Sequence, residues 1–183
     1  MRFAIGKSVL NVVSVYAPQV GRTIEEKEEF YFLLGEVLKD VGENEKLIVC
    51  GDMNGYVGAG ADGFEGVHGG KGFGIRNAEG EMLEFADAMG LAVCNTRFTK
   101  KDSQKVTYES GGCKSEVDYV LIKREKRQMV SNVTVIQCEA YIPQHKLMIC
   151  VTKLKEDVRK RREGFVSECR VWKLKEADVT SSG

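Results

Sequence analysis

Apolar positions along the chain form short β-branched runs that are interrupted by one longer helical series. Residues 9–18 (VLNVVSVYAP) are rich in valine and stop at a proline, which predicts a buried strand that ends in a turn. In residues 23–42 apolar side chains recur at helical spacing, and Thr23 stands three residues before Glu26, as in a capping box. EKLIVCGD (45–52) predicts the next strand. Strand, helix and strand form a βαβ-like unit, which favours an α/β fold.

The pattern changes between residues 55 and 74, where glycine recurs every few positions. A phosphate-cradling loop is one interpretation. However, neither a Walker pattern nor G-x-G-x-x-G between a strand and a helix is present, so a long surface loop is favoured. The further predicted elements are a helix at 77–91, a strand at 91–99, a hairpin at 106–123, and strands at 132–142 and 145–154.

The last part of the chain differs in composition from the rest. The sequence has 183 residues, which suits one domain. From residue 155 onward charged residues dominate, so we predict a domain at 1–154 and a loosely ordered tail at 155–183. RKRR (159–162) is typical of a nuclear address or a phosphate contact, but a solvated charged segment is favoured.

Charge and cysteine content restrict the possible partners and compartments. Lys+Arg and Asp+Glu are equal at 27 each, so a polyanion such as DNA must be met by a local patch. No apolar run approaches the roughly 18 residues that a membrane span needs. The six cysteines include no C-x-x-C pair and there is no clear signal peptide. We therefore expect reduced thiols in an intracellular protein, with a disulfide framework as the alternative.

Several polar residues interrupt apolar strands. Asp52 and Asn54 follow a buried strand, and if that strand continues through GDMN both side chains point the same way and can hold one water. The alternative is an Asx turn. Asp118 lies inside SEVDYVLI, either with a partner or at a water-facing strand edge. Near Asp118, His145 would form a hydrolytic His–Asp pair; alone it would be structural. Tyr16 is either a site residue or a rim aromatic.

The motifs VSVYAPQ, GDMN, SEVDYVLI and PQHKLM occur in an order that resembles the endonuclease/exonuclease/phosphatase superfamily. The similarity is greater to the endonuclease domain of RTE-type LINE retrotransposons and to the craniofacial development protein 2-like proteins derived from them. GFEGVHGGKGFGIRNAEGEMLEFADAMGLAVCNTRF and VTYESGGCKSEVDYVL resemble that subgroup in particular. The resemblance covers residues 9–154.

The resemblance implies a fold, a reaction and residue roles. The implied fold is a two-sheet sandwich flanked by helices, a four-layer α/β/β/α arrangement of the DNase I-like type. The implied reaction is Mg²⁺-dependent hydrolysis of phosphodiester or phosphomonoester bonds, with DNA as partner. Asp52 would accept a proton from the attacking water that Asn54 positions. His145 would contact the scissile phosphate, Asp118 would orient His145, and Tyr16 would lie near the phosphate.

Other positions depart from the family pattern. Thr107 matches a substrate-contact position less closely. The chain begins at the strand that carries Tyr16, so we expect the family's upstream Asn and metal-binding Glu to be missing and the domain to be incomplete at its N-terminus. Gln144 replaces a family Asp and is a poorer ligand for Mg²⁺. We therefore expect impaired catalysis and a strand edge open to self-association. The alternatives are a non-catalytic nucleic-acid-binding remnant and a phosphomonoesterase.

Overall fold

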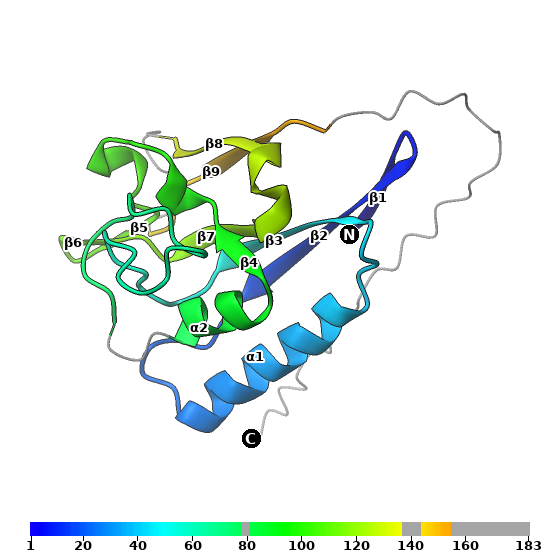
Figure 1. Cartoon of the computed structure of the whole chain (residues 1–183). Helices are drawn as coiled ribbons and strands as arrows, with labels where there is room; N and C mark the ends of the chain where they lie inside the picture. The colour runs from blue at the N-terminus through cyan, green and yellow to red at the C-terminus, as the bar shows by residue number, and fades with distance from the viewer. Residues whose placement is uncertain (78–80, 137–143, 155–183) are drawn as a thin grey trace, which may run out of the picture.

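A five-stranded mixed sheet forms the centre of the protein (Figure 1). The computed structural model describes residues 1–77, 81–136 and 144–154. β2 and β3 run parallel, and every other neighbouring pair in this sheet is antiparallel. The strands in spatial order are β1 (Arg2–Ile5), β2 (Ser8–Tyr16), β3 (Lys46–Asp52), β7 (Asp118–Lys123) and β4 (Leu91–Val93).

Helix α1 (Ile24–Lys39) connects the two parallel strands, as the βαβ pattern predicts. The Thr23 side chain accepts from the backbone N–H of Glu26, and the Glu26 carboxylate accepts from the backbone N–H of Thr23, so the predicted capping box is confirmed. The helix ends at Lys39, three residues before the end of the predicted helical stretch at residue 42. β1 was not predicted as a separate strand. It pairs along β2 and covers its outer edge.

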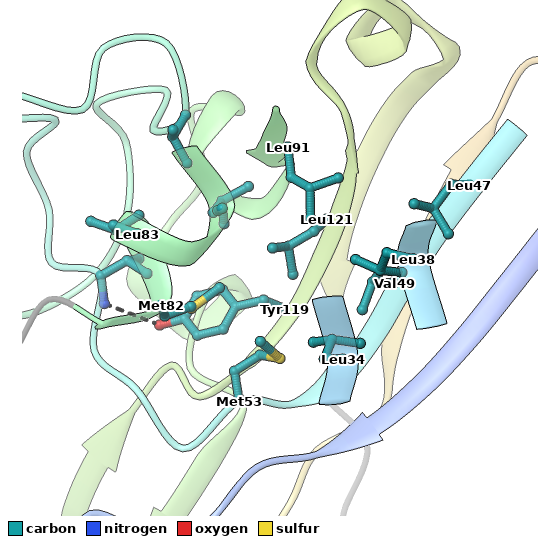
Figure 2. Packing of buried hydrophobic residues seen from close by; sticks show 14 residues of the cluster. Leu34, Leu38, Leu47, Val49, Met53, Met82, Leu83, Leu91, Tyr119 and Leu121 are labelled. Atoms are coloured by element: carbon teal, nitrogen blue, oxygen red, sulfur yellow. Dashed lines mark hydrogen bonds between the residues drawn. The ribbon is translucent and has the colours of Figure 1, made fainter. Parts of the chain in front are cut away.

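The helices cover one face of the sheet. Leu34 and Leu38 of α1 and Leu83 of α2 (Glu81–Ala88) pack against alternate residues of β3 and β7 in one apolar cluster. Figure 2 shows Tyr119 at its centre. The Tyr119 hydroxyl is fully buried but satisfied, because it accepts from the backbone N–H of Val57 at 3.4 Å and donates to a backbone carbonyl.

A second, smaller sheet packs against the opposite face. It consists of β8 (Val130–Val135) and β9 (Met148–Thr152), paired antiparallel. Its inward residues form a second apolar cluster with Ile48, Val120 and Ile122 of the large sheet. The predicted α/β class and two-sheet sandwich are confirmed. The described residues form three layers, which are the helices, the large sheet and the small sheet. Among these residues no α-helix covers the outer face of β8 and β9, where a fourth layer was expected.

The remaining elements are short. The predicted 106–123 hairpin divides into a small hairpin of two three-residue strands and then β7, which pairs with β3 and β4 instead. The predicted strand at 91–99 is only three residues long and continues as a 3₁₀ turn. These elements are β5 (Tyr108–Ser110), β6 (Cys113–Ser115), and the 3₁₀ turns η1 (Asn95–Arg97), η2 (Asp102–Gln104) and η3 (Arg124–Met129).

The glycine-rich region and the thiols follow the favoured interpretations. Residues 55–74 form a long loop without helix or strand, although Val57, Val67 and His68 within it are buried. Four cysteines in the described part of the chain are free thiols. None of the described helices has the length and apolarity needed to cross a membrane. The predicted tail at 155–183 lies outside the described residues.

Candidate active site

Three predicted site residues lie in one row across the large sheet. In the register of the strands Tyr16 is opposite Asp52, and Asp52 is opposite Asp118. Register partners on neighbouring strands point to the same face, and here that face also carries Cys50 and Val120 of the inter-sheet cluster. The row therefore lies at the end of the seam between the two sheets.

His145 completes the cluster from outside the large sheet. Its ring nitrogen Nδ1 lies 3.0 Å from Asp118 Oδ2, and Nε2 lies 3.7 Å from Asp52 Oδ2. The β5 strand and the residue before it hold this segment in place, because Glu109 donates its backbone N–H to the Gln144 carbonyl at 2.9 Å and Lys146 donates its backbone N–H to the Thr107 carbonyl at 2.7 Å. His145 thus reaches two carboxylates that are adjacent on neighbouring strands.

The environment of Asp52 favours a proton acceptor. Its side chain is only 8% exposed, and burial raises the pKa of the carboxyl above its ordinary value. The Asn54 N–H bond opposes that rise in pKa, the Asp118 carboxylate adds to it, and His145 opposes it. His145 is 36% exposed, so a ligand reaches this pair from the histidine side. A buried carboxylate with a raised pKa is a stronger base than an exposed one.

Asn54 differs from the prediction. β3 ends at Asp52, and Asn54 has a left-handed φ of 45°, so the assumption that the strand continues through GDMN is wrong. The Asp52 carboxylate accepts from the Asn54 N–H at 2.9 Å, which is the Asx turn of the alternative interpretation. The Asn54 amide Nδ2 donates to the Ala17 carbonyl at 2.7 Å. This bond orients the amide and leaves its oxygen Oδ1 as the group that can accept from a water.

Thr107 also differs from the prediction, which placed it in contact with the substrate. The side chain is fully buried, and its hydroxyl oxygen accepts from the backbone N–H groups of Val117 at 2.9 Å and Asp118 at 3.1 Å. A side chain with no exposed surface is not positioned to contact a substrate, so the expected substrate contact is corrected to a structural role. Thr107 holds the backbone where the 106–123 segment divides and thereby fixes the start of β7.

Two buried residues that support Asp118 were missed in the sequence. The Asn95 amide donates to the Asp118 carbonyl at 3.0 Å and to Glu116 Oε1 at 3.1 Å, and its oxygen accepts from the Val120 N–H at 2.9 Å. Glu116 is 3% exposed, and burial raises the pKa of its carboxyl to about 7. The signal was an acid two residues before Asp118 on the same face of an apolar strand.

The site offers two carboxylates, Asp52 and Asp118, to the magnesium ion that the resemblance implies. Mg²⁺ requires near-octahedral oxygen ligands and usually one or two carboxylates. Here Asp52 and Asp118 both face the ring nitrogens of His145, and the neutral Gln144 amide donates to Ser110 Oγ at 3.4 Å. Within the described ranges no group of three or more His, Cys, Asp or Glu side chains is arranged to hold a metal.

Solved structures share this fold. No family model and no curated protein matches the chain. The 3′ phosphatase NExo from Neisseria bound to product DNA hairpin matches with a TM-score of 0.59 and 13% identity over 84% of this chain and 64% of that one. The 3′-5′ exonuclease NExo from Neisseria meningitidis matches with a TM-score of 0.57 and 15% identity over 80% and 62%.

A retrotransposon enzyme has the same architecture. The endonuclease domain of TRAS1, a telomere-specific non-LTR retrotransposon, matches with a TM-score of 0.50 and 15% identity over 79% of this chain and 56% of that one. The chain therefore spans less than two thirds of the length of these structures. At this level of identity the comparisons show the fold alone, which this chain shares with these three structures.

Proposed function

We propose that the site binds and hydrolyses phosphate esters, with DNA phosphodiesters as the substrate class. The observation that carries this proposal is His145 between two carboxylates, 3.0 Å from Asp118 and 3.7 Å from Asp52. One imidazole edge is oriented by a carboxylate, and the other faces a group suited to take a proton. The fold shared with nucleases and 3′ phosphatases, one of them bound to a DNA hairpin, supports the same chemistry.

In the proposed reaction Asp52 takes a proton from a water that attacks phosphorus. The Asn54 amide oxygen accepts the second hydrogen of that water and so fixes its direction. Protonated His145 donates from Nδ1 to Asp118 and from Nε2 to a phosphate oxygen, where negative charge grows. The P–O bond to the ester oxygen breaks as the new P–O bond to the water oxygen forms, and the leaving oxygen takes a proton from solvent water. Tyr16, 66% exposed at the end of the row, lies beside the path of the phosphate.

We further propose that hydrolysis by this chain is weak. In metal-dependent phosphoesterases magnesium neutralises phosphate charge and contributes several kcal/mol to the transition state. Among the described residues no group of three or more His, Cys, Asp or Glu side chains could hold the ion, and its loss would correspond to orders of magnitude in rate. The same observation favours a second candidate function, a domain that binds nucleic acid without cutting it.

Two substrates of different reactivity distinguish weak hydrolysis from nucleic-acid binding without cleavage. With Mg²⁺ present, the full chain is expected to hydrolyse the activated diester bis(p-nitrophenyl) phosphate slowly and to leave supercoiled plasmid intact. Asp52→Asn and His145→Ala should abolish the slow turnover, while Glu125→Gln, an exposed control, should retain it. Plasmid nicking that the two site variants lose would refute the proposed weakness.

Absence of turnover with either ester, together with salt-sensitive DNA binding, would reject hydrolysis and favour the binding domain. Faster turnover of the monoester p-nitrophenyl phosphate than of the diester would instead indicate a phosphomonoesterase.

A further inference from the structure

A second polar cavity lies away from the row formed by Tyr16, Asp52 and Asp118. It measures about 330 Å³ and is enclosed by residues 65–69 of the glycine-rich loop, Ala92 of β4, Arg97 of η1 and Arg127 of η3. Ala92 pairs with Ile122 of β7. Ile122 lies four residues along β7 from Asp118, a distance of about 13 Å at the usual rise of a strand.

The two arginines that line this cavity have no anionic partner among the residues that the structure describes. Nη1 of Arg97 is buried and has no hydrogen-bond partner, and neither Arg97 nor Arg127 forms an ion pair within residues 1–77, 81–136 and 144–154. The acidic lining residue, Glu65, already accepts the backbone N–H of Gly63 at 3.1 Å. The cavity therefore presents an excess of positive charge.

The glycine-rich loop lies close to the arginines because it lacks side chains at the contact. A Cβ added at Gly69 would lie 2.5 Å from the Thr96 carbonyl oxygen and 2.6 Å from Arg97 Cα. The Gly69 N–H also donates to Thr96 Oγ1 at 2.8 Å, which fixes the loop against η1. This wall is therefore part of the packed structure, although most of the loop has no regular secondary structure.

His68 lines the same cavity but is not available to a ligand. Its Nδ1 accepts from the Gly70 N–H at 2.9 Å, so Nε2 carries the proton and donates to the Gly58 carbonyl at 3.1 Å. Burial lowers the pKa of His68, in agreement with a neutral ring. The recognition groups of the cavity are thus the two guanidinium groups.

We infer that this cavity binds a phosphate group through Arg97 and Arg127. Guanidinium groups bind phosphate with paired N–H donors, and Arg97 and Arg127 both line the cavity. The volume lies at the small end of ligand sites, large enough for a phosphate with part of its substituent. The phosphate comes either from a free phosphate or mononucleotide, or from a DNA backbone at a distance from the scissile bond. The DNA source rests on the proposed function.

Thermal unfolding of the full chain tests the free-phosphate source. Phosphate, and separately a nucleoside monophosphate, would be added against potassium chloride at matched ionic strength, with far-UV circular dichroism as the signal. Binding to the folded state raises the unfolding midpoint. The rise should occur in the wild type, in His145→Ala and in Lys126→Gln, whose exposed charge lies next to Arg127, and it should be lost in Arg97→Gln and Arg127→Gln.

Fluorescence anisotropy with a labelled DNA duplex tests the backbone source. The slope of log K against log salt concentration should fall by about 0.9 for each phosphate contact removed, in Arg97→Gln and in Arg127→Gln but not in Lys126→Gln. Arg127 is exposed, so Arg127→Gln keeps the test valid if Arg97→Gln fails to fold. His145→Ala should retain this arginine dependence, which separates the cavity from the active site.

A response to phosphate or nucleotide alone would support the free-ligand source, and a response to DNA alone would support the backbone source. The inference is overturned if neither arginine variant changes either measurement, or if Lys126→Gln changes them to the same extent. Loss of ester hydrolysis with intact arginine-dependent binding would reject the proposed reaction but not this site.

Discussion

Replacement of Glu116 with glutamine is expected to stabilise the protein above neutral pH. Glu116 is 3% exposed, and its Oε2 has no hydrogen-bond partner among the described residues. Its Oε1 accepts from Asn95, a bond that the amide oxygen of an isosteric glutamine can keep while the buried negative charge is removed. The variant thus changes charge with little change in shape.

The magnitude follows from the pKa. Burial raises the pKa of Glu116 from 4.5 to about 7. Below pH 4.5 the carboxyl is protonated in both states, so its ionisation costs the folded state nothing. As pH rises from 4.5 through 7 the unfolded state ionises first and the free energy of unfolding falls. At about 1.4 kcal/mol for each pH unit between the two values, the loss approaches about 3 kcal/mol.

Urea denaturation between pH 4.5 and pH 8 gives the measurement. Far-UV circular dichroism is the suitable signal, because Trp172, the sole tryptophan of the chain, lies outside the described residues. The free energy of unfolding of Glu116→Gln minus that of the wild type should grow with pH and level off above pH 7. Glu125→Gln, which removes the charge of an exposed acid, is the matched control. A flat difference for Glu116→Gln would refute the reasoning about burial.

Three further results are expected. Thr107→Val should lower the free energy of unfolding by about 2–4 kcal/mol because two buried backbone N–H groups lose their acceptor, whereas Thr107→Ser, which keeps the oxygen, should cost much less in the same urea titration. Gly51→Ala should lower the free energy of unfolding by more than about 4 kcal/mol or prevent folding, because its Cβ would lie 2.0 Å from the Val15 carbonyl oxygen at a φ of 141°. A urea midpoint equal to that of the wild type would contradict this prediction. His68 should stay neutral in the folded protein below pH 6.5, so it contributes stability that is lost as pH falls, and its imidazole NMR signal should titrate at a lower pH than in urea.

Local patterns predicted most of the large sheet. The capping box at Thr23 and the β-branched runs on either side of α1 depend only on residues that are close in sequence, and the βαβ unit follows from them. The position of Asp52 beside Asp118 could not be predicted in the same way. It depends on the register in which β3 and β7 pair, and only the fold fixes that register. The catalytic roles assigned to these residues stay predictions.

Other features were not predictable because they depend on contacts between distant segments. The 106–123 hairpin divides where the Thr107 hydroxyl accepts two backbone N–H groups, so an apparently continuous strand ends early. Asn54 leaves the strand because its amide is bonded to the Ala17 carbonyl. Asn95 follows a short strand in a 3₁₀ turn, and nothing adjacent in sequence indicates that its amide binds β7.

The position of His145 has a consequence for how the protein forms during synthesis. Asp52 and Asp118 come to lie opposite each other as soon as β7 pairs with β3. The histidine is 27 residues further along the chain (145 − 118). Its contact with Asp52 closes a segment of 93 residues (145 − 52), and such distant contacts form slowly because chain entropy must be lost first. A nascent chain that has completed the large sheet therefore still lacks the histidine, and the site matures only when the last strand docks.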